Sequence, residues 1–188
     1  MIFGTTPSQT VGPYFAIGLP WDAGPHAVDP DASGAIRIGG MVYDGHGDLV
    51  PDALIETWGA DAEGRFPDLR EHGGPSGVAE FRGFARSGFE DGDGSWEIVT
   101  LKPGRVAGPG GAEQAPHLAV SVFARGMLNR CVTRIYFGDE QEANAADPVL
   151  LHVPAERRGT LIAEPSGDGT YRFDIRLQGE GETVFFAI

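Results

Sequence analysis

The chain has 188 residues, a length that suits one globular domain with a sizeable core. Hydrophobic residues make up 41% of it, and 27 acidic against 14 basic side chains give a formal net charge of −13. This negative excess repels phosphate backbones and anionic membrane surfaces, so we expect neither nucleic acid nor a membrane as a partner.

Cysteine content and the N-terminal sequence bear on the compartment. The single cysteine, Cys131, has no second cysteine to pair with and lies in an apolar run typical of a small core residue. The first residues show neither the basic nor the apolar segment of a signal peptide, and no apolar run is long enough to span a bilayer. We therefore expect a cytoplasmic protein that forms one domain over residues 1–188.

The first segment, residues 1–35, contains frequent Pro and Gly without a helix or strand period. It also carries large apolar side chains, such as Tyr14 and Trp21, which a disordered tail does not usually hold. We expect an extended, non-helical arm that packs on its own domain or on a partner, followed by a core over residues 36–188.

A strand pattern begins after the arm, over Ile36–Tyr43, with Gly39 and Gly40 inside it as a bulge or a point of close approach. The run Asp44–Gly47 predicts a tight turn. Apolar runs bounded by turn signals predict further strands at 54–58, 95–100, 117–124, 132–137, 171–177 and 184–188.

Helix signals are sparse. Asp139 is placed to cap a helix over Glu140–Ala146, and a helical turn is expected after Pro154. The runs 62–86 and 105–115 are irregular and predict loops. Short strands with many turns and little helix predict an all-β fold, either an antiparallel β-sandwich or a barrel.

The segment Ala115–Val122 is the most informative for function. Residues i and i+2 of a strand point to the same face, so two histidines at that spacing could bind one metal. Here His117 is followed at i+2 by Ala119, and one imidazole alone is a poor metal site. On its own terms His117 is best interpreted as a buried neutral histidine with a backbone partner.

Several blocks resemble the intradiol ring-cleavage dioxygenases: Gly40–Gly47, Val50–Asp61, Gly83–Arg86, Asp91–Trp96 and Leu101–Gly104. The two ends, Thr6–Phe15 and Tyr171–Phe186, resemble the α subunit of a two-chain member of this family that acts on protocatechuate. The resemblance implies an intradiol-type β-sandwich with an extended N-terminal arm and one or two short helices. It also implies intradiol cleavage of protocatechuate (3,4-dihydroxybenzoate) with O2 to 3-carboxy-cis,cis-muconate, in the β-ketoadipate pathway of aromatic catabolism.

The family holds a mononuclear Fe(III) with two tyrosines and two histidines, and this chain departs from that set. Val106 stands where the tyrosine after the Lys-Pro-Gly turn belongs, and no other tyrosine lies between Tyr43 and Tyr136. Ala119 replaces the second histidine, which leaves His117 as the one retained ligand-like position. The resemblance thus implies no catalytic residue and no metal on this chain. It places Fe(III) on a homologous β subunit, within a larger symmetric hetero-oligomer.

What the resemblance assigns to this chain is a substrate-pocket lining at the subunit interface. Thr10, Gly12, Pro13 and Tyr14 match the arm segment that packs on the partner and lines its iron pocket. Arg134 lies in an apolar strand, and its guanidinium could pair with the substrate carboxylate, directly or through intervening groups. From the residues alone, a structural ion pair of Arg134 with an Asp or Glu is an equal alternative.

Two other functions stay open at this stage. A non-catalytic β-sandwich binding module would show an exposed aromatic platform and would be stable as a monomer. A self-sufficient catechol-type dioxygenase with atypical ligands would need His117 to converge on the iron with Tyr136 or Tyr43.

Overall fold

The structure is a computed structural model that describes residues 10, 12, 14–67, 81–88 and 94–187. Strands dominate it, and the β-sandwich expected from the sequence is confirmed. The strands are β1 (Ala35–Tyr43), β2 (Leu54–Trp58), β3 (Phe84–Ser87), β4 (Ser95–Leu101), β5 (Val106–Ala107), β6 (Glu113–Gln114), β7 (His117–Phe123), β8 (Cys131–Phe137), β9 (Ile162–Gly167), β10 (Thr170–Arg172) and β11 (Ile175–Arg176). The helices are α1 (Tyr14–Gly18), α2 (Gln141–Ala146), α3 (Pro148–His152) and the 3₁₀ helices η1 (Pro109–Gly111) and η2 (Ala155–Leu161).

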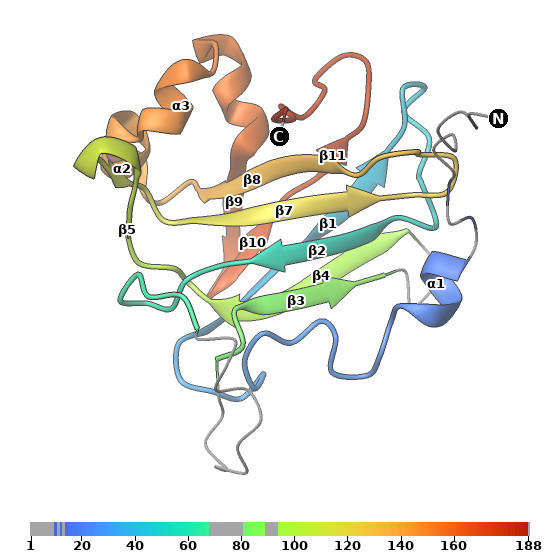
Figure 1. Cartoon of the computed structure of the whole chain (residues 1–188), viewed down its shortest axis with the longest axis horizontal. Helices are drawn as coiled ribbons and strands as arrows, with labels where there is room; N and C mark the ends of the chain where they lie inside the picture. Colours follow the sequence, from blue (N-terminus) through green and yellow to red (C-terminus); the bar gives the residue numbers. More distant parts are fainter. Residues whose placement is uncertain (1–9, 11, 13, 68–80, 89–93, 188) are drawn as a thin grey trace, which may run out of the picture.

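The main sheet follows the order β11-β1-β10-β9-β8-β7-β2-β3, and β4 pairs with β1 (Figure 1). Most neighbours are antiparallel, but β1 runs parallel to β10 and β11, and β8 runs parallel to β9. The pairing is therefore mixed rather than wholly antiparallel. Parallel neighbours need a long crossover, which α2, α3 and η2 provide between β8 and β9.

Side chains that alternate along the strands point inward and build the main core of the sandwich. In β7 the inward residues Leu118, Val120 and Val122 are buried, whereas His117 and Ala119 on the other face are more exposed. A second cluster lies under the helices, where Tyr136, Leu150, Leu161 and their neighbours are buried together. One end of the sheet is thus covered on its outer side by α2 and α3, and α1 lies at the opposite end (Figure 1).

Gly40 confirms the expected close approach inside the first strand. The register of β1 against β4 runs without a shift from Ala35 to Met41, so no bulge forms there. Instead, a Cβ atom at Gly40 would overlap the carbonyl group of Phe173 and would come within 2.9 Å of the Asp174 carboxylate. The chain crosses this point between β10 and β11, which is why residues 171–177 form two short strands rather than the single predicted one.

Four strands were missed: the two-residue strands β5 and β6 pair with each other inside the run 105–115 that was predicted to be a loop, and two strands of the main sheet, β3 and β9, have sequences that lack a strong pattern. β3 lies in the region predicted to be irregular, and its pairing with β2 determines its conformation. β9 is mostly exposed and polar, and it forms where it pairs with β10 and the end of β8. In both, tertiary contacts override weak local propensity.

The expected final strand is wrong for the part that the structure describes. Residues 184–187 form no regular strand, although two hydrogen bonds attach them to β8. The Phe186 backbone N–H donates to the Val132 carbonyl at 2.8 Å, and the Thr133 hydroxyl donates to the Val184 carbonyl at 2.7 Å. The segment therefore follows the edge of β8 without a continuous ladder.

The predicted cap of the first internal helix is also wrong. Glu140 occupies the N-cap of α2 and makes no side-chain cap. The Asp139 carboxylate instead accepts hydrogen bonds from Lys102 at 2.8 Å and from the Tyr171 hydroxyl at 3.0 Å. These bonds hold the pKa of Asp139 below its ordinary value, although its partial burial acts in the opposite direction. The helical turn expected after Pro154 is confirmed as η2.

The N-terminal segment, residues 1–35, contains a helical turn and contacts the sheet of its own chain. Tyr14–Gly18 forms one helical turn, α1, in the region predicted to be non-helical. Further along, Ala27 and Val28 are buried, and the Ala27 backbone N–H donates to the Val99 carbonyl at 2.7 Å. The later part of the segment thus packs on its own sheet. Within the part of the chain that the structure describes, every helix is too short or too polar to span a membrane.

We expect Gly40→Ala to lower the free energy of unfolding by about 1–3 kcal/mol, because the added methyl group overlaps the Phe173 backbone, which cannot rotate away. Chemical denaturation of the purified protein measures this change. Gly159→Ala is the matched control, since a Cβ atom at Gly159 meets no heavy atom within 4 Å. Equal stability of the two variants would contradict the close approach.

Candidate functional site

The outer row is a line of four residues on the outer face of the sheet: Phe84, Trp58, Ala119 and Arg134. They are direct cross-strand neighbours on β3, β2, β7 and β8, so their side chains share one face. Ala119, the replaced ligand position, lies directly between Trp58 and Arg134. The row ends beside the helix-covered end of the sheet, where His117 pairs with Tyr136.

His117 keeps the orientation of a metal-binding histidine. Its Nδ1 lies 2.7 Å from the Ala115 carbonyl oxygen. Because a carbonyl can only accept, Nδ1 carries the proton and Nε2 is left as the acceptor. Burial lowers the pKa of His117, and the positive charge of Arg134 lowers it further, so the imidazole is neutral near pH 7. The expected backbone partner of this histidine is therefore present.

Arg134 is anchored by neutral groups. One guanidinium nitrogen, Nη1, donates to the Gln114 amide oxygen at 2.7 Å and to the Tyr136 hydroxyl at 3.1 Å. No carboxylate among the described residues lies within 4.0 Å, so the alternative of a structural ion pair is not formed there. Nε and Nη2 have no partner within the described part of the chain and stay available as donors.

Asp147 holds in place the hydrogen-bond network of Arg134, Gln114 and Tyr136. Its side chain is fully buried and accepts a hydrogen bond from the Tyr136 hydroxyl at 3.1 Å. The same carboxylate accepts from the backbone N–H of Ala115, Val149 and Leu150, each at 2.8 Å. It thus caps α3 and ties that helix to the start of β7. The Asp147-Pro148 pair, a cap followed by proline at the first helical position, was the available sequence signal.

Tyr136 lies close to His117 but does not fit as an iron ligand. The two rings are 5.5 Å apart between centroids. Burial raises the pKa of Tyr136, and its hydroxyl already donates to Asp147, so the phenolate that a ferric ion requires is disfavoured. Tyr43 is also engaged, because the guanidinium of Arg176 lies 4.7 Å from its ring centroid.

The residues at the positions that the resemblance assigns to iron ligands, together with the neighbouring Tyr136, do not fit a ferric ion. His117 offers one imidazole nitrogen, Ala119 and the buried Val106 offer no donor atom, and Tyr136 stays protonated. Among the described residues, no three His, Cys, Asp or Glu side chains are grouped as a metal would require. The chemistry that these positions support is binding and positioning.

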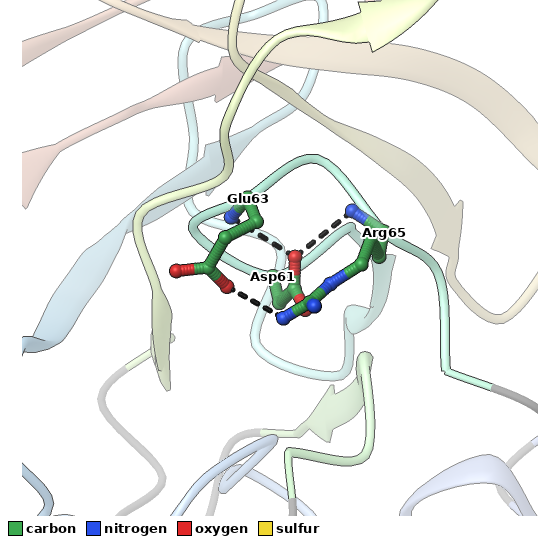
Figure 2. Close-up of polar contacts among 3 residues, drawn as sticks. All are labelled: Asp61, Glu63 and Arg65. Atoms are coloured by element: carbon green, nitrogen blue, oxygen red, sulfur yellow. Dashed lines mark hydrogen bonds and ion pairs between the residues drawn. The ribbon is translucent and has the colours of Figure 1, made fainter.

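A turn after β2 holds the segment that leads to Val106. The Asp61 carboxylate accepts from the backbone N–H of Glu63 and Arg65, and the Arg65 guanidinium bonds to both carboxylates (Figure 2). Burial opposes ionisation, but these bonds hold the pKa of Asp61 below its ordinary value. The Gly104 backbone N–H donates to the Asp61 carbonyl at 2.8 Å, which fixes the Lys-Pro-Gly turn.

The predicted arm residues lie apart from Arg134. Thr10, Gly12 and Tyr14 directly precede or begin α1, which lies at the end of the sheet opposite to α2 and α3 (Figure 1). Tyr14 is 68% exposed, Gly12 has a positive φ of 72°, and its N–H donates to the Thr10 hydroxyl at 3.3 Å. Pro13 lies outside the described residues. Within this chain, the two groups of candidate residues do not form one pocket.

Outward aromatic rings form a feature that the sequence analysis missed. Trp58 stacks on Phe66 with ring centroids 6.2 Å apart, and Trp21 stacks on Phe84 at 6.3 Å. The Arg86 guanidinium lies 5.2 Å from the Trp21 ring centroid and 5.5 Å from that of Phe84. Trp21 and Phe84 come from segments distant in sequence, and Trp58 and Phe66 from a strand and the loop that follows it, so no single local pattern could have grouped the four rings.

The chain is similar over nearly its whole length to known dioxygenase subunits. A family model described as Dioxygenase matches residues 11–179. The chain is 48% identical to the protocatechuate 3,4-dioxygenase alpha chain of Burkholderia cepacia, over 97% of both chains. It is 33% identical to the beta chain from the same organism, over 79% of this chain and 66% of that one.

Solved structures support the fold assignment. The dioxygenase domain of a dioxygenase–carbohydrate-binding protein fusion from Streptomyces sp. SirexAA-E superposes with a TM-score of 0.59. The two sequences are 22% identical, and the match covers 94% of this chain and 99% of that one. At this identity the likeness shows the common fold alone.

We expect Asp147→Asn to lower the free energy of unfolding by roughly 2–4 kcal/mol, because an amide replaces a buried oxygen that accepts from protein donors. Thermal and denaturant unfolding measure the loss. The exposed Asp168→Asn is the control for removing a negative charge, and we expect it to change stability by less than about 0.5 kcal/mol. A neutral effect of Asp147→Asn would show that the network does not stabilise this end of the sheet.

Proposed function

The chain belongs to the intradiol ring-cleavage dioxygenase family, and on this premise we propose that it is the iron-free α subunit of a protocatechuate 3,4-dioxygenase. In this proposal it forms a cytoplasmic hetero-oligomer with a homologous β chain that holds the Fe(III). The iron supplies the activation of the catechol ring toward O2 when it is bound there. This chain contributes shape and binding groups to the pocket in which protocatechuate is cleaved to 3-carboxy-cis,cis-muconate.

One observation carries the assignment of iron to the partner. The positions that correspond to the ligand set hold His117, Ala119 and Val106, and the adjacent Tyr136 is kept protonated by burial. A single available imidazole does not bind a ferric ion strongly, because hard anionic oxygen ligands are missing. The match to α chains over almost the full length, next to a weaker match to a β chain, supports a division of labour between two homologous subunits.

The arm supports a role in lining the partner's pocket. Tyr14 is largely exposed within this chain, so its ring is available for burial against another chain. Gly12 has a backbone conformation that favours glycine, and no heavy atom lies within 4 Å of the position that its Cβ atom would take. Together with Thr10 and Pro13, these residues would supply hydroxyl groups and a rigid apolar wall. Burial of the arm would stabilise the assembly by about 25 cal/mol per Å² of apolar area, before the costs of association.

Arg134 is the proposed contact for the substrate carboxylate. Its guanidinium is partly buried, has no carboxylate partner among the described residues, and keeps Nε and Nη2 available. A guanidinium with two available donor nitrogens can make a bidentate hydrogen-bonded pair with a carboxylate. Because the arm leads into α1, at the end of the sheet opposite to α2 and α3 (Figure 1), whereas Arg134 contacts Gln114 and Tyr136, this contact depends on how the subunits pack against each other.

A non-catalytic binding module is the second candidate, and the outward aromatic rings favour it. Phe66 is 52% exposed and Trp21 is 40% exposed, as in a surface on which a ligand could stack. The same rings would serve equally as an apolar interface with a partner chain. A stable monomer that does not associate with a β-type chain would favour the binding module.

We expect iron and activity only when this chain is produced together with a homologous β-type chain. The purified complex should contain ferric iron and consume O2 with protocatechuate, while this chain alone should contain less than about 0.1 iron per chain, because one imidazole does not retain the ion. Metal analysis and an oxygen electrode measure both quantities. Stoichiometric iron in this chain alone, or activity without a partner, would refute the proposal.

We expect Arg134→Ala in the active complex to raise KM for protocatechuate by about thirtyfold, as loss of a charged hydrogen bond of roughly 2 kcal/mol requires. Steady-state oxygen uptake measures the change. Catechol, which lacks the carboxylate, is the matched substrate, and its kinetic constants should change much less. An equal loss with both substrates would show that Arg134 acts only through the structure.

A further inference from the structure

We propose that Arg134 is a resident cation that excludes metal ions from the place on this chain that corresponds to the family's iron site. This inference rests on the proposed role of the chain as the iron-free subunit, and it deepens that role. Loss of ligands weakens a metal site, whereas a fixed positive charge opposes the metal even when a ligand is restored. The two explanations therefore predict different metal affinities after the second histidine is restored at position 119.

The strand register brings the guanidinium to the replaced ligand. Arg134 on β8 is the direct cross-strand partner of Ala119 on β7. His117 and Ala119 are two residues apart on β7, so both point to the same outer face as Arg134. A metal held between imidazoles at these two positions would share that face with the guanidinium.

The guanidinium is held in place and makes no direct ion pair with a described residue, and the nearest carboxylate in its network, that of Asp147, is separated from it by the Tyr136 hydroxyl. Gln114 and the Tyr136 hydroxyl fix Nη1, and Asp147 fixes the Tyr136 hydroxyl in turn. No described carboxylate lies within 4.0 Å of Arg134. The charge is also partly buried, and salt screens partly buried charges less than exposed ones.

The positive charge of Arg134 makes the binding of a metal cation between positions 117 and 119 electrostatically unfavourable. A divalent or trivalent metal bound beside a guanidinium that makes no direct ion pair would experience like-charge repulsion in a partly desolvated setting, which the more distant Asp147 carboxylate offsets only in part. Arg134 also lies close to the one retained ligand position, because His117 is two residues from Ala119, the cross-strand partner of Arg134, and points to the same face. His117 nevertheless keeps its ring orientation through the Ala115 carbonyl, so its Nε2 remains geometrically available.

Restoring the second histidine with and without the positive charge tests the proposal. Zn2+ is titrated calorimetrically into the full-length chain, in whichever assembly it purifies, as the parent protein and as Ala119→His, Ala119→His/Arg134→Gln and Ala119→His/Arg134→Lys. We expect Ala119→His to bind Zn2+ no more than threefold tighter than the parent. The variant with Arg134→Gln should bind at least tenfold tighter than Ala119→His, whereas the variant with Arg134→Lys, which keeps the charge, should not.

Two results would overturn the proposal: strong Zn2+ binding by Ala119→His alone, or no gain in affinity from Arg134→Gln. A second measurement covers the case in which the Arg134 variants do not fold. With Arg134 intact, Ala119→Glu should raise Tm relative to Ala119→Lys, because position 119 lies directly opposite the guanidinium. Equal Tm values would show that no net positive charge resides there. Neither measurement uses dioxygenase activity, so failure here is distinguishable from failure of the proposed subunit role.

Discussion

The buried carboxylate of Asp147 is the contact on which the outer side of this sandwich depends. It satisfies backbone donors from α3 and from the start of β7, and it also orients the Tyr136 hydroxyl. That hydroxyl in turn accepts from Arg134. A charged side chain is retained in an apolar cluster because each oxygen has partners. The geometry around Tyr136 and Arg134 follows from this one satisfied group.

In the proposed subunit, the site presents a positive charge where the family binds a metal, on a chain that keeps the family's fold. β7 still carries His117 with its Nδ1 proton directed to the Ala115 carbonyl, as a ligand strand would require. Ala119 and Val106 offer no donor atom, and both lie in regular strands, β7 and β5. Arg134 then places a cation where a metal would have supplied positive charge. A homologous subunit can therefore keep the fold while it loses the ion.

The sequence predicted the features that rest on local pattern and missed those that rest on distant contacts. Alternation located β1, β2, β4, β7 and β8, whereas the replacement of ligands at Ala119 and Val106 remains a prediction from the resemblance. β3 and β9 were missed because their partners, rather than their own residues, determine their pairing. Asp139 was wrongly predicted to cap α2. Its actual partner, Lys102, lies 37 positions away in the sequence, so no local pattern indicated this bond. The hydrogen bond between Gln114 and Arg134 was missed for the same reason, because it joins two separate segments.

The chain that follows α1 is attached to the outer face of the sheet beside the aromatic rings, and this attachment favours a subunit over an independent binding module. The Arg86 guanidinium stacks near Trp21, pairs with Glu56, and donates to the Leu19 carbonyl at 3.0 Å. The chain that follows α1 is thereby attached to the outer face of the sheet. A binding platform for a free ligand has no need of such an attachment. A surface that must present an arm to a second chain does, because ordering the arm beforehand lowers the entropic cost of association.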